Sequence, residues 1–124
     1  MANRKASISG DRLRIEMEFI QTPDQASRVS IRPVGPFTVY ERRAIRDMLR
    51  EVLAAQDDHF EFDTSGMAAV DPYGMGAILL LHGEKARVRR PFTLNVRGGD
   101  VGDYLNKYGV LAIVRHRAGA GAQA

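Results

Sequence analysis

Acidic and hydroxyl side chains gather in two short turns near the middle of the chain. The first turn, Asp63-Thr64-Ser65-Gly66, follows a strand-like run, and the second, Asp71-Pro72-Tyr73-Gly74, opens an apolar helical segment. Open α/β sheets place their working surface at the carboxyl ends of the strands. Two neighbouring carboxylates at such an edge could transfer a proton, or they could accept hydrogen bonds from backbone N–H groups and cap the next element.

Acid catalysis is the first of these possibilities. Phe62-Asp63-Thr64 matches part of the apolar-Asp-Thr-Gly motif of aspartic proteases, in which two carboxylates share one proton. That motif needs Gly directly after Thr, whereas Ser65 stands there and Gly66 comes one place late. Asp63 is therefore predicted to be a turn residue that accepts backbone N–H groups. An enzyme using Asp63 and Asp71 is kept as a third hypothesis, but no nucleophile with its base is recognisable, so we predict no enzyme and no catalytic residue.

Metal, cofactor and nucleic-acid sites find little support. The histidines, His59, His82 and His116, are not spaced as ligands on one element, and the chain has no cysteine. There is no P-loop motif, and Arg97-Gly98-Gly99-Asp100 alone is a weak phosphate signal. Basic residues exceed acidic ones by 18 to 15 only, which does not favour a nucleic-acid partner. We predict no metal and no cofactor.

The length and composition are those of one globular domain. A chain of 124 residues can bury one modest core. We place the domain at residues 11–117 and expect flexible tails over the polar residues 1–10 and the small-residue segment 118–124. The start of the chain has no apolar leader and no run of residues is long enough to be a transmembrane segment, so the expected location is the cytoplasm.

The pattern of apolar residues predicts four strands. A period of two over Arg12–Ile20 is typical of a half-buried strand. A second strand runs through Val29 and Ile31 and is expected to end at Pro33 and Gly35-Pro36. The two remaining predicted strands are Phe60–Phe62 and Phe92–Val96.

Three helices are predicted between and after these strands. Thr38-Val39-Tyr40-Glu41 has the form of a capping box at the start of the first helix. Asp71 is a favoured N-cap residue and Pro72 a favoured first residue for the second helix. The third helix covers Val101–Tyr108, with Gly109 as the residue that follows its end. The predicted order β-β-α-β-α-β-α is an α/β chain.

The second helix has two apolar faces when it is projected at 100° per residue. The face expected to pack on the sheet carries Met75, Ile78, Leu79, His82 and Ala86. The opposite face carries Tyr73, Gly76, Ala77 and Leu80. Small residues between a Tyr and a Leu leave room for another backbone to approach.

The segment Phe60–Leu81 resembles the core of the STAS domain, the fold of bacterial anti-sigma factor antagonists. In that family the strand reads apolar-Asp-apolar-Ser-Gly and the helix opens with Asp-Ser-Ser-Gly; here the helix opens with Asp71-Pro72-Tyr73-Gly74. The resemblance covers about residues 27–114 and implies a STAS-like mixed β-sheet with helices packed mainly on one face. It also aligns Tyr73 with the family's regulatory phosphoserine, and Thr38 with an acidic residue of the family.

The resemblance implies a non-enzymatic regulator of bacterial transcription that binds a kinase-type anti-sigma factor by partner switching. Because Tyr73 replaces the phosphoserine, we expect phospho-switching to be lost or altered. The partner-binding residues that it implies are Thr38, Asp71, Tyr73, Ala77 and Leu80. The alternative is a small STAS regulatory subunit of a lipid-transport ABC system, whose partner is an ATPase subunit; the basic outer faces of the first two helices are compatible with it.

Overall fold

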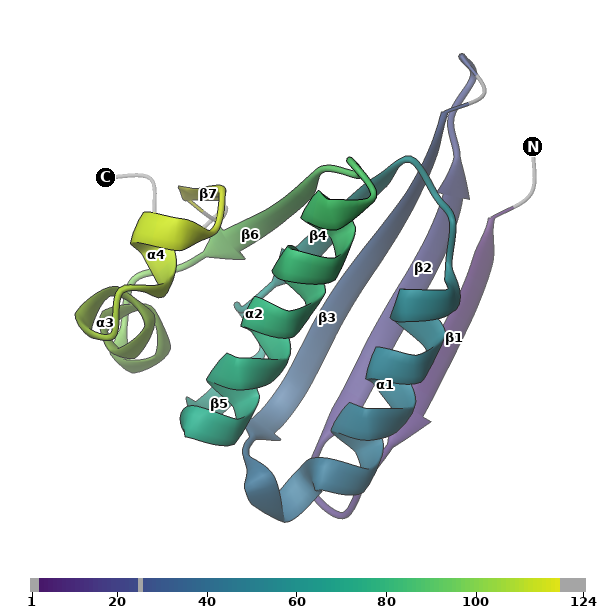
Figure 1. Cartoon of the computed structure of the whole chain (residues 1–124). Helices are drawn as coiled ribbons and strands as arrows, with labels where there is room; N and C mark the ends of the chain where they lie inside the picture. The colour runs from purple at the N-terminus through teal and green to yellow at the C-terminus, as the bar shows by residue number, and fades with distance from the viewer. Residues whose placement is uncertain (1–2, 25, 119–124) are drawn as a thin grey trace.

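The computed structural model describes residues 3–24 and 26–118, and within them the chain forms a seven-stranded mixed sheet with helices on one face (Figure 1). The strands are β1 (Arg4–Ser9), β2 (Arg14–Gln21), β3 (Ser27–Phe37), β4 (His59–Asp63), β5 (Met67–Val70), β6 (Phe92–Val96) and β7 (His116–Ala118). The helices are the 3-10 helix η1 (Val39–Glu41) and the α-helices α1 (Arg42–Ala54), α2 (Pro72–Arg87), α3 (Asp100–Lys107) and α4 (Val110–Ile113). The predicted α/β class is confirmed.

The strands follow the order β1-β2-β3-β4-β6-β7, and β5 pairs with β3 outside this path. The pairs β1–β2 and β2–β3 are antiparallel, whereas β3, β4, β6 and β7 run parallel. The strands β3, β4 and β6 therefore end at the same edge of the sheet, which we call the carboxyl edge. The starts of η1, α2 and α3 are connected to this edge by short segments, so the chain brings three helix starts together there.

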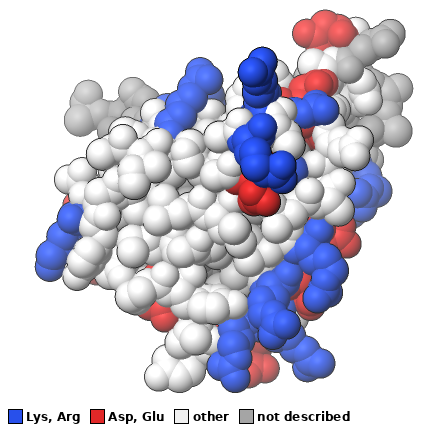
Figure 2. Space-filling model, viewed as in Figure 1, with Lys and Arg blue, Asp and Glu red and all other residues white. Residues whose placement is uncertain are grey.

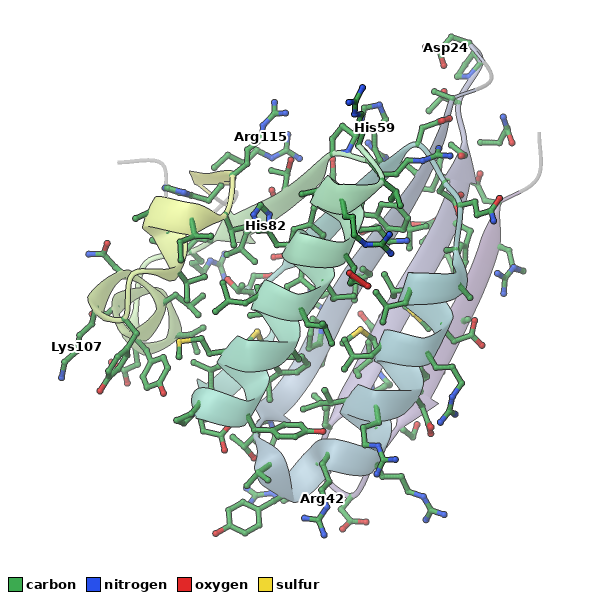
Figure 3. All side chains as sticks on the ribbon, in the orientation of Figure 1. Asp24, Arg42, His59, His82, Lys107 and Arg115 are labelled. Atoms are coloured by element: carbon green, nitrogen blue, oxygen red, sulfur yellow. The ribbon has the colours of Figure 1, made fainter. Side chains whose placement is uncertain are left out.

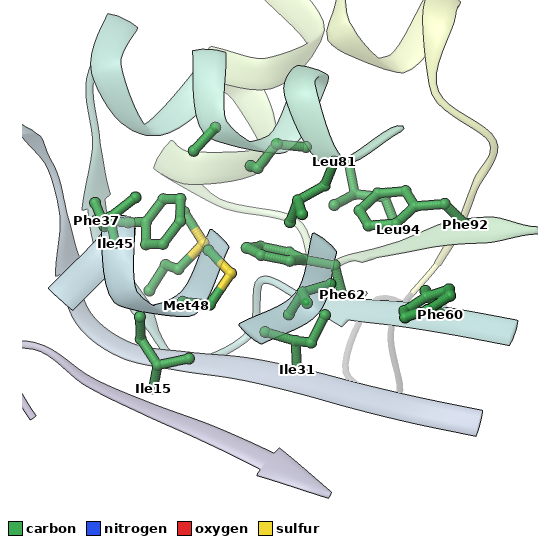
Figure 4. Close-up of a cluster of buried hydrophobic side chains, with 14 of the residues drawn as sticks. Ile15, Ile31, Phe37, Ile45, Met48, Phe60, Phe62, Leu81, Phe92 and Leu94 are labelled. Atoms are coloured by element: carbon green, nitrogen blue, oxygen red, sulfur yellow. The ribbon is translucent and has the colours of Figure 1, made fainter. Parts of the chain in front are cut away.

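Alternating burial along the strands explains why the helices cover one face. Ile31, Phe62 and Leu94 are register neighbours on β3, β4 and β6, and all three are fully buried. Figure 4 shows them packed with side chains of α1 and α2 in one continuous cluster. Their sequence neighbours Glu61 and Thr93 point to the other, polar face, as a period of two requires. The core thus lies between the sheet and the two longest helices.

The predicted flexible tail over residues 1–10 is wrong for Arg4–Ser9. These residues form β1, which pairs along its whole length with β2. The turn between the two strands is fixed from the inside, because the buried Glu41 carboxylate accepts hydrogen bonds from the N–H groups of Arg12 and Leu13 at 3.2–3.3 Å. At the other end, residue 118 closes β7, and the predicted tail over 119–124 lies outside the described residues.

The hydrogen bonds of Glu41 to the β1–β2 turn also show that the predicted capping box is wrong. Thr38 is the N-cap of η1, but its side chain makes no capping hydrogen bond; its carbonyl oxygen accepts the N–H of Glu41 at 2.9 Å. Glu41 is only 4 % exposed. Its carboxylate is drawn to the β1–β2 turn because two unpaired backbone N–H groups are available there, so it does not reach back to Thr38.

β3 also continues past its predicted end, through Pro33 and Pro36. On the side of β3 that faces β4 and β5, pairing with β4 ends at Ile31 and pairing with β5 begins at Gly35. Pro33 lies between these two paired stretches, so its missing N–H removes no hydrogen bond with either strand. The register shifts between Gly35 and Pro36. The short strand β5 was not predicted from the sequence, nor were β1 and β7.

Two of the helix predictions are confirmed. The buried side of α1 carries Ile45, Met48 and Val52 at helical spacing. Gly109 follows the end of α3 in the left-handed region, with φ of 80°, which glycine adopts without the steric cost of a Cβ.

Candidate functional site

A single carboxylate joins the starts of two helices at the carboxyl edge. Asp71 is the N-cap of α2, and its Oδ1 accepts the N–H of Gly74 at 2.9 Å. Its Oδ2 accepts the N–H of Val39, the first residue of η1, at 3.0 Å. Pro72 occupies the first helical position, where its missing N–H is no loss. The predicted helix start is confirmed, and Asp71 has a second role that the sequence did not reveal.

Gly74 allows α2 to lie directly against the end of β3. A Cβ built at Gly74 would overlap the carbonyl oxygen of Phe37 and would stand 2.8 Å from the Cδ2 atom of its ring. Phe37 itself is fully buried and packs edge-on against Phe62, with ring centroids 5.6 Å apart. The backbone of α2 is thereby held at a fixed height above the sheet, and so are the residues on either side of Gly74.

The second acidic turn offers no chemistry of its own. Asp63 accepts the N–H of Ser65 at 2.9 Å, as a turn residue does, and its other oxygen is 3.9 Å from Arg32. This confirms the predicted turn role of Asp63. The nearby hollow, between the 64–68 segment and the start of α3, measures about 240 Å³, which is below the usual range of ligand pockets, roughly 300–1,000 Å³. The edge is therefore a surface for contact more than a pocket.

The face of α2 that is buried differs by about one residue position from the face predicted by the helical projection of the sequence. The side chains or backbone buried along this helix are Gly74, Ala77, Ile78, Leu81 and Lys85. Ala77 is only 5 % exposed and belongs to the core, so its predicted place on the outward face is wrong. The cause is Gly74, whose close approach to Phe37 rotates the helix. The outward stripe, here called the α2 outer stripe, consists of Pro72, Gly76, Leu80 and Gly83.

The other predicted contact residues lie in two places along this surface. Thr38 and Tyr73 are half-buried beside Asp71, because the bond from Val39 to Asp71 brings their two segments together. Tyr73 also packs against the core with part of its ring. Leu80 is 46 % exposed and lies two turns further along α2. Thr38, Asp71 and Tyr73 thus form one group, and Leu80 continues it along the α2 outer stripe.

Three further tyrosines lie near this group and were not singled out from the sequence as contact residues. Tyr40, on η1, is 87 % exposed. Tyr104 and Tyr108 of α3 pair with ring centroids 4.7 Å apart. Burial, and then the nearby Tyr108 and the negative charge of Asp71, raise the pKa of Tyr104. α3 packs beside β5, the strand that leads into α2. Tyrosine is one of the residue types enriched in protein interfaces, so the carboxyl edge has the composition of a contact surface.

Charge divides the helix-bearing side of the molecule into two areas. Figure 2 shows Lys and Arg side chains gathered over α1 and a further charged group at the end of α2, while the area over the first part of α2 is nearly free of charge. Among the described residues, no group of His, Cys, Asp and Glu could hold a metal ion. His82 is partly buried at the edge of the core, with its ring 6.4 Å from that of Phe92. No helix in the described part of the chain is long and apolar enough to cross a membrane.

Comparison with solved structures identifies proteins of the same architecture. An anti-sigma factor antagonist from Mycobacterium paratuberculosis superposes with a TM-score of 0.66 at 12 % sequence identity, covering 93 % of this chain and 85 % of that one. A serine-to-glutamate variant of RsbS from Moorella thermoacetica gives a TM-score of 0.62 at 12 % identity, covering 84 % and 87 %. The anti-sigma factor antagonist SpoIIAA in its unphosphorylated form gives 0.59 at 13 % identity, covering 84 % and 89 %.

No protein-family model and no curated protein sequence matches the chain. The likeness therefore lies in three-dimensional structure, with identities too low to transfer a partner or a site. It bears out the resemblance that the Phe60–Leu81 segment indicated. The chain has the STAS fold, the fold of the anti-sigma factor antagonists.

Proposed function

We propose that this protein is a non-enzymatic regulator that works like a bacterial anti-sigma factor antagonist. It binds a kinase-type anti-sigma factor in the cytoplasm and so influences transcription. The contact surface consists of the group around Asp71, with Thr38 and Tyr73, and continues to Leu80. Ala77 supports this surface from the core and makes no contact of its own.

The observation that carries the proposal is the α2 outer stripe. It presents proline, two glycines and a half-exposed leucine, with no charged side chain before Glu84, which pairs with Arg87 at the end of the helix. A Cβ added at Gly76 or Gly83 would meet nothing within 4 Å, so the stripe is open to solvent along its length. An uncharged, low-relief helix face beside half-buried tyrosines suits a protein partner, because buried interface centres are depleted in charge and rich in aromatic residues.

Tyr73 changes how such a protein is regulated. Phosphorylation adds a double negative charge and disrupts an interface when that charge has no basic partner. A phenol carries its hydroxyl several ångströms further from the backbone than serine does, and the ring of Tyr73 is partly packed against the core. We therefore propose that Tyr73 is a constant aromatic contact and that a serine-directed kinase does not switch it.

Isothermal calorimetry tests this proposal with the purified chain and each kinase-type anti-sigma factor encoded in the same genome. One of them should bind, and Tyr73→Ala and Leu80→Glu should each weaken binding about tenfold or more, as interface anchors do. Ile113→Glu is the matched control: Ile113 is also exposed but lies on α4, and its substitution should leave binding unchanged. With ATP present, Tyr73→Ser should become phosphorylated at position 73, whereas the unaltered chain should not.

The second candidate function is that of a STAS subunit in a lipid-transport ABC system. The basic outer side of α1 favours it, because such a subunit works beside an anionic membrane surface. Co-expression with the ATPase subunits of the same genome separates the two functions. A stable complex with an ATPase subunit, together with no binding to any anti-sigma factor, would replace the first proposal by the second.

A further inference from the structure

Three arginines at the start of α1 have no partner for their charge. Arg42, Arg43 and Arg46 are exposed, and within the described part of the chain their guanidinium groups make no hydrogen bond or ion pair. Arg50, one turn further along, differs because it pairs with Asp47 at 3.3 Å. We call Arg42, Arg43 and Arg46 the arginine cluster.

The position of the cluster is electrostatically unfavourable for folding. The N-terminus of a helix carries a partial positive charge, which disfavours cations and attracts anions. The first turn of α1 contains no acidic residue, and Arg42 and Arg43 are its first two residues. The preceding Glu41 does not offset them at the surface, since its carboxylate is buried against the β1–β2 turn. Residues that break a local rule of stability without compensation are expected at functional positions.

The cluster adjoins the proposed contact surface. Tyr40 precedes it and is almost fully exposed, and the bond from Val39 to Asp71 joins this segment to the start of α2. Figure 3 places Arg42 at the end of the molecule where α1 and α2 begin, away from the end that carries His59 and Arg115. Arginine and tyrosine are the side chains most often found as anchors of protein interfaces.

We propose that the arginine cluster, with Tyr40, binds an acidic segment of the partner protein. Carboxylates there would satisfy the free guanidinium groups and would also meet the positive end of α1. This inference rests on the proposed function, since it names the chemistry of the partner at the border of the same surface.

The surroundings favour a protein over a nucleic acid. A nucleic acid is held by basic groups that follow its phosphates over a long path. Here the three arginines adjoin the uncharged α2 outer stripe, and the basic area does not continue across it (Figure 2). A partner that is acidic at one border and apolar beside it matches both areas.

The test uses two synthetic peptides with the same leucine spacing, one carrying glutamates and the other glutamines between the leucines. Each is titrated into the full ¹⁵N-labelled chain at low salt and followed by NMR. The glutamate peptide should shift the signals of Tyr40, Arg42, Arg43 and Arg46, and the glutamine peptide should not. Replacing all three arginines by glutamine should weaken binding of the glutamate peptide about tenfold, because the variant loses three surface ion pairs that each contribute modestly to the binding free energy.

A matched control replaces three arginines elsewhere that also lack side-chain partners among the described residues, namely Arg89, Arg97 and Arg115. This control variant has the same net charge as the arginine-cluster variant, but it should bind the glutamate peptide as tightly as the unaltered chain does. Equal weakening in both triple variants would reduce the effect to net charge and overturn the inference. It would also be overturned if the glutamate peptide fails to bind, or if a single-stranded oligonucleotide or a phosphatidylglycerol vesicle binds the cluster more tightly than the peptide.

The outcomes separate this inference from the proposed function. If an anti-sigma factor binds at Tyr73 and Leu80 but the arginine-cluster variant binds it normally, only the acidic-segment inference fails. If the glutamate peptide binds at the cluster but no anti-sigma factor binds the chain, the inference stands and the proposed function fails.

Discussion

Two glycines of α2, two positions apart, should respond to the same substitution in opposite ways. A Cβ at Gly74 would overlap the carbonyl oxygen of Phe37, whereas a Cβ at Gly76 would meet nothing within 4 Å. Both positions lie inside the same helix, so the change in helix propensity is the same for the two alanine variants. The difference between them therefore measures the contact between α2 and the end of β3.

The magnitudes follow from this geometry. Alanine stabilises a helix interior by about 1 kcal/mol relative to glycine, so Gly76→Ala should raise the free energy of unfolding by roughly that amount. At Gly74 the same gain is outweighed, because the Cβ must push α2 off a backbone atom that cannot rotate away. Overpacking of this kind costs about 1–3 kcal/mol, and the bond from Gly74 to Asp71 is lost as well, at about 1 kcal/mol. Gly74→Ala should therefore be about 2 kcal/mol less stable than the unaltered chain.

Urea denaturation followed by circular dichroism measures these values, since the chain has no tryptophan to report by fluorescence. With a slope of about 1–3 kcal/mol per molar urea, the two midpoints should differ by more than about 1 M. Gly83→Ala, at another open position of the same helix, should behave like Gly76→Ala. Equal midpoints for Gly74→Ala and Gly76→Ala would refute the close packing of α2 on Phe37 and with it the orientation of the contact surface.

Three more perturbations test other parts of the structure. Asp71→Ala should lower the free energy of unfolding by about 2 kcal/mol in the same assay, because it removes the cap of α2 and the bond to Val39; Asp71→Asn should keep the cap and lose about half as much. Arg43→Glu should stabilise the fold by about 0.5 kcal/mol, since it places an anion at the positive end of α1; a loss of stability would show that Arg43 serves folding. Burial lowers the pKa of Lys85 below 10.5, so unfolding takes up a proton in the interval between the two values and stability should rise with pH there. Lys85→Met should remove that part of the slope, and an unchanged slope would contradict the burial of the charged amine.

The strands that build the core were predictable because their burial alternates. Phe60–Phe62 and Phe92–Val96 carry large apolar residues at every second position, and the structure buries them as expected. β1 gave no such signal, since Arg4–Ser9 contains only Ala6 and Ile8 as apolar residues and is fixed by pairing and by Glu41. β5 is four residues long between two turns, and its partner is distant in sequence. β1 and β5 both form because of tertiary contacts, which cannot be recognised from the local pattern of residues.

The candidate site was predictable in position but not in orientation. Asp71-Pro72 identifies the start of α2 from its capping chemistry alone. The outward face of that helix could not be fixed, because apolar residues surround it and the decisive contact is between Gly74 and a backbone carbonyl on another strand. A glycine in the first turn was the one available signal of that close approach. The position of α3 beside β5 needs the whole topology, since α3 returns to the carboxyl edge only after β6.

The most direct test of the central claim is the hydrogen-exchange footprint of a bound anti-sigma factor on this chain. Amides in η1, the first turn of α2 and the turn that carries Leu80 should gain protection in the complex, while those of α4 and the polar face of the sheet should not. Protection on the polar face, around Glu16 and Arg32, with none at the start of α2, would contradict the claim that this fold meets its partner through the carboxyl edge and the α2 outer stripe.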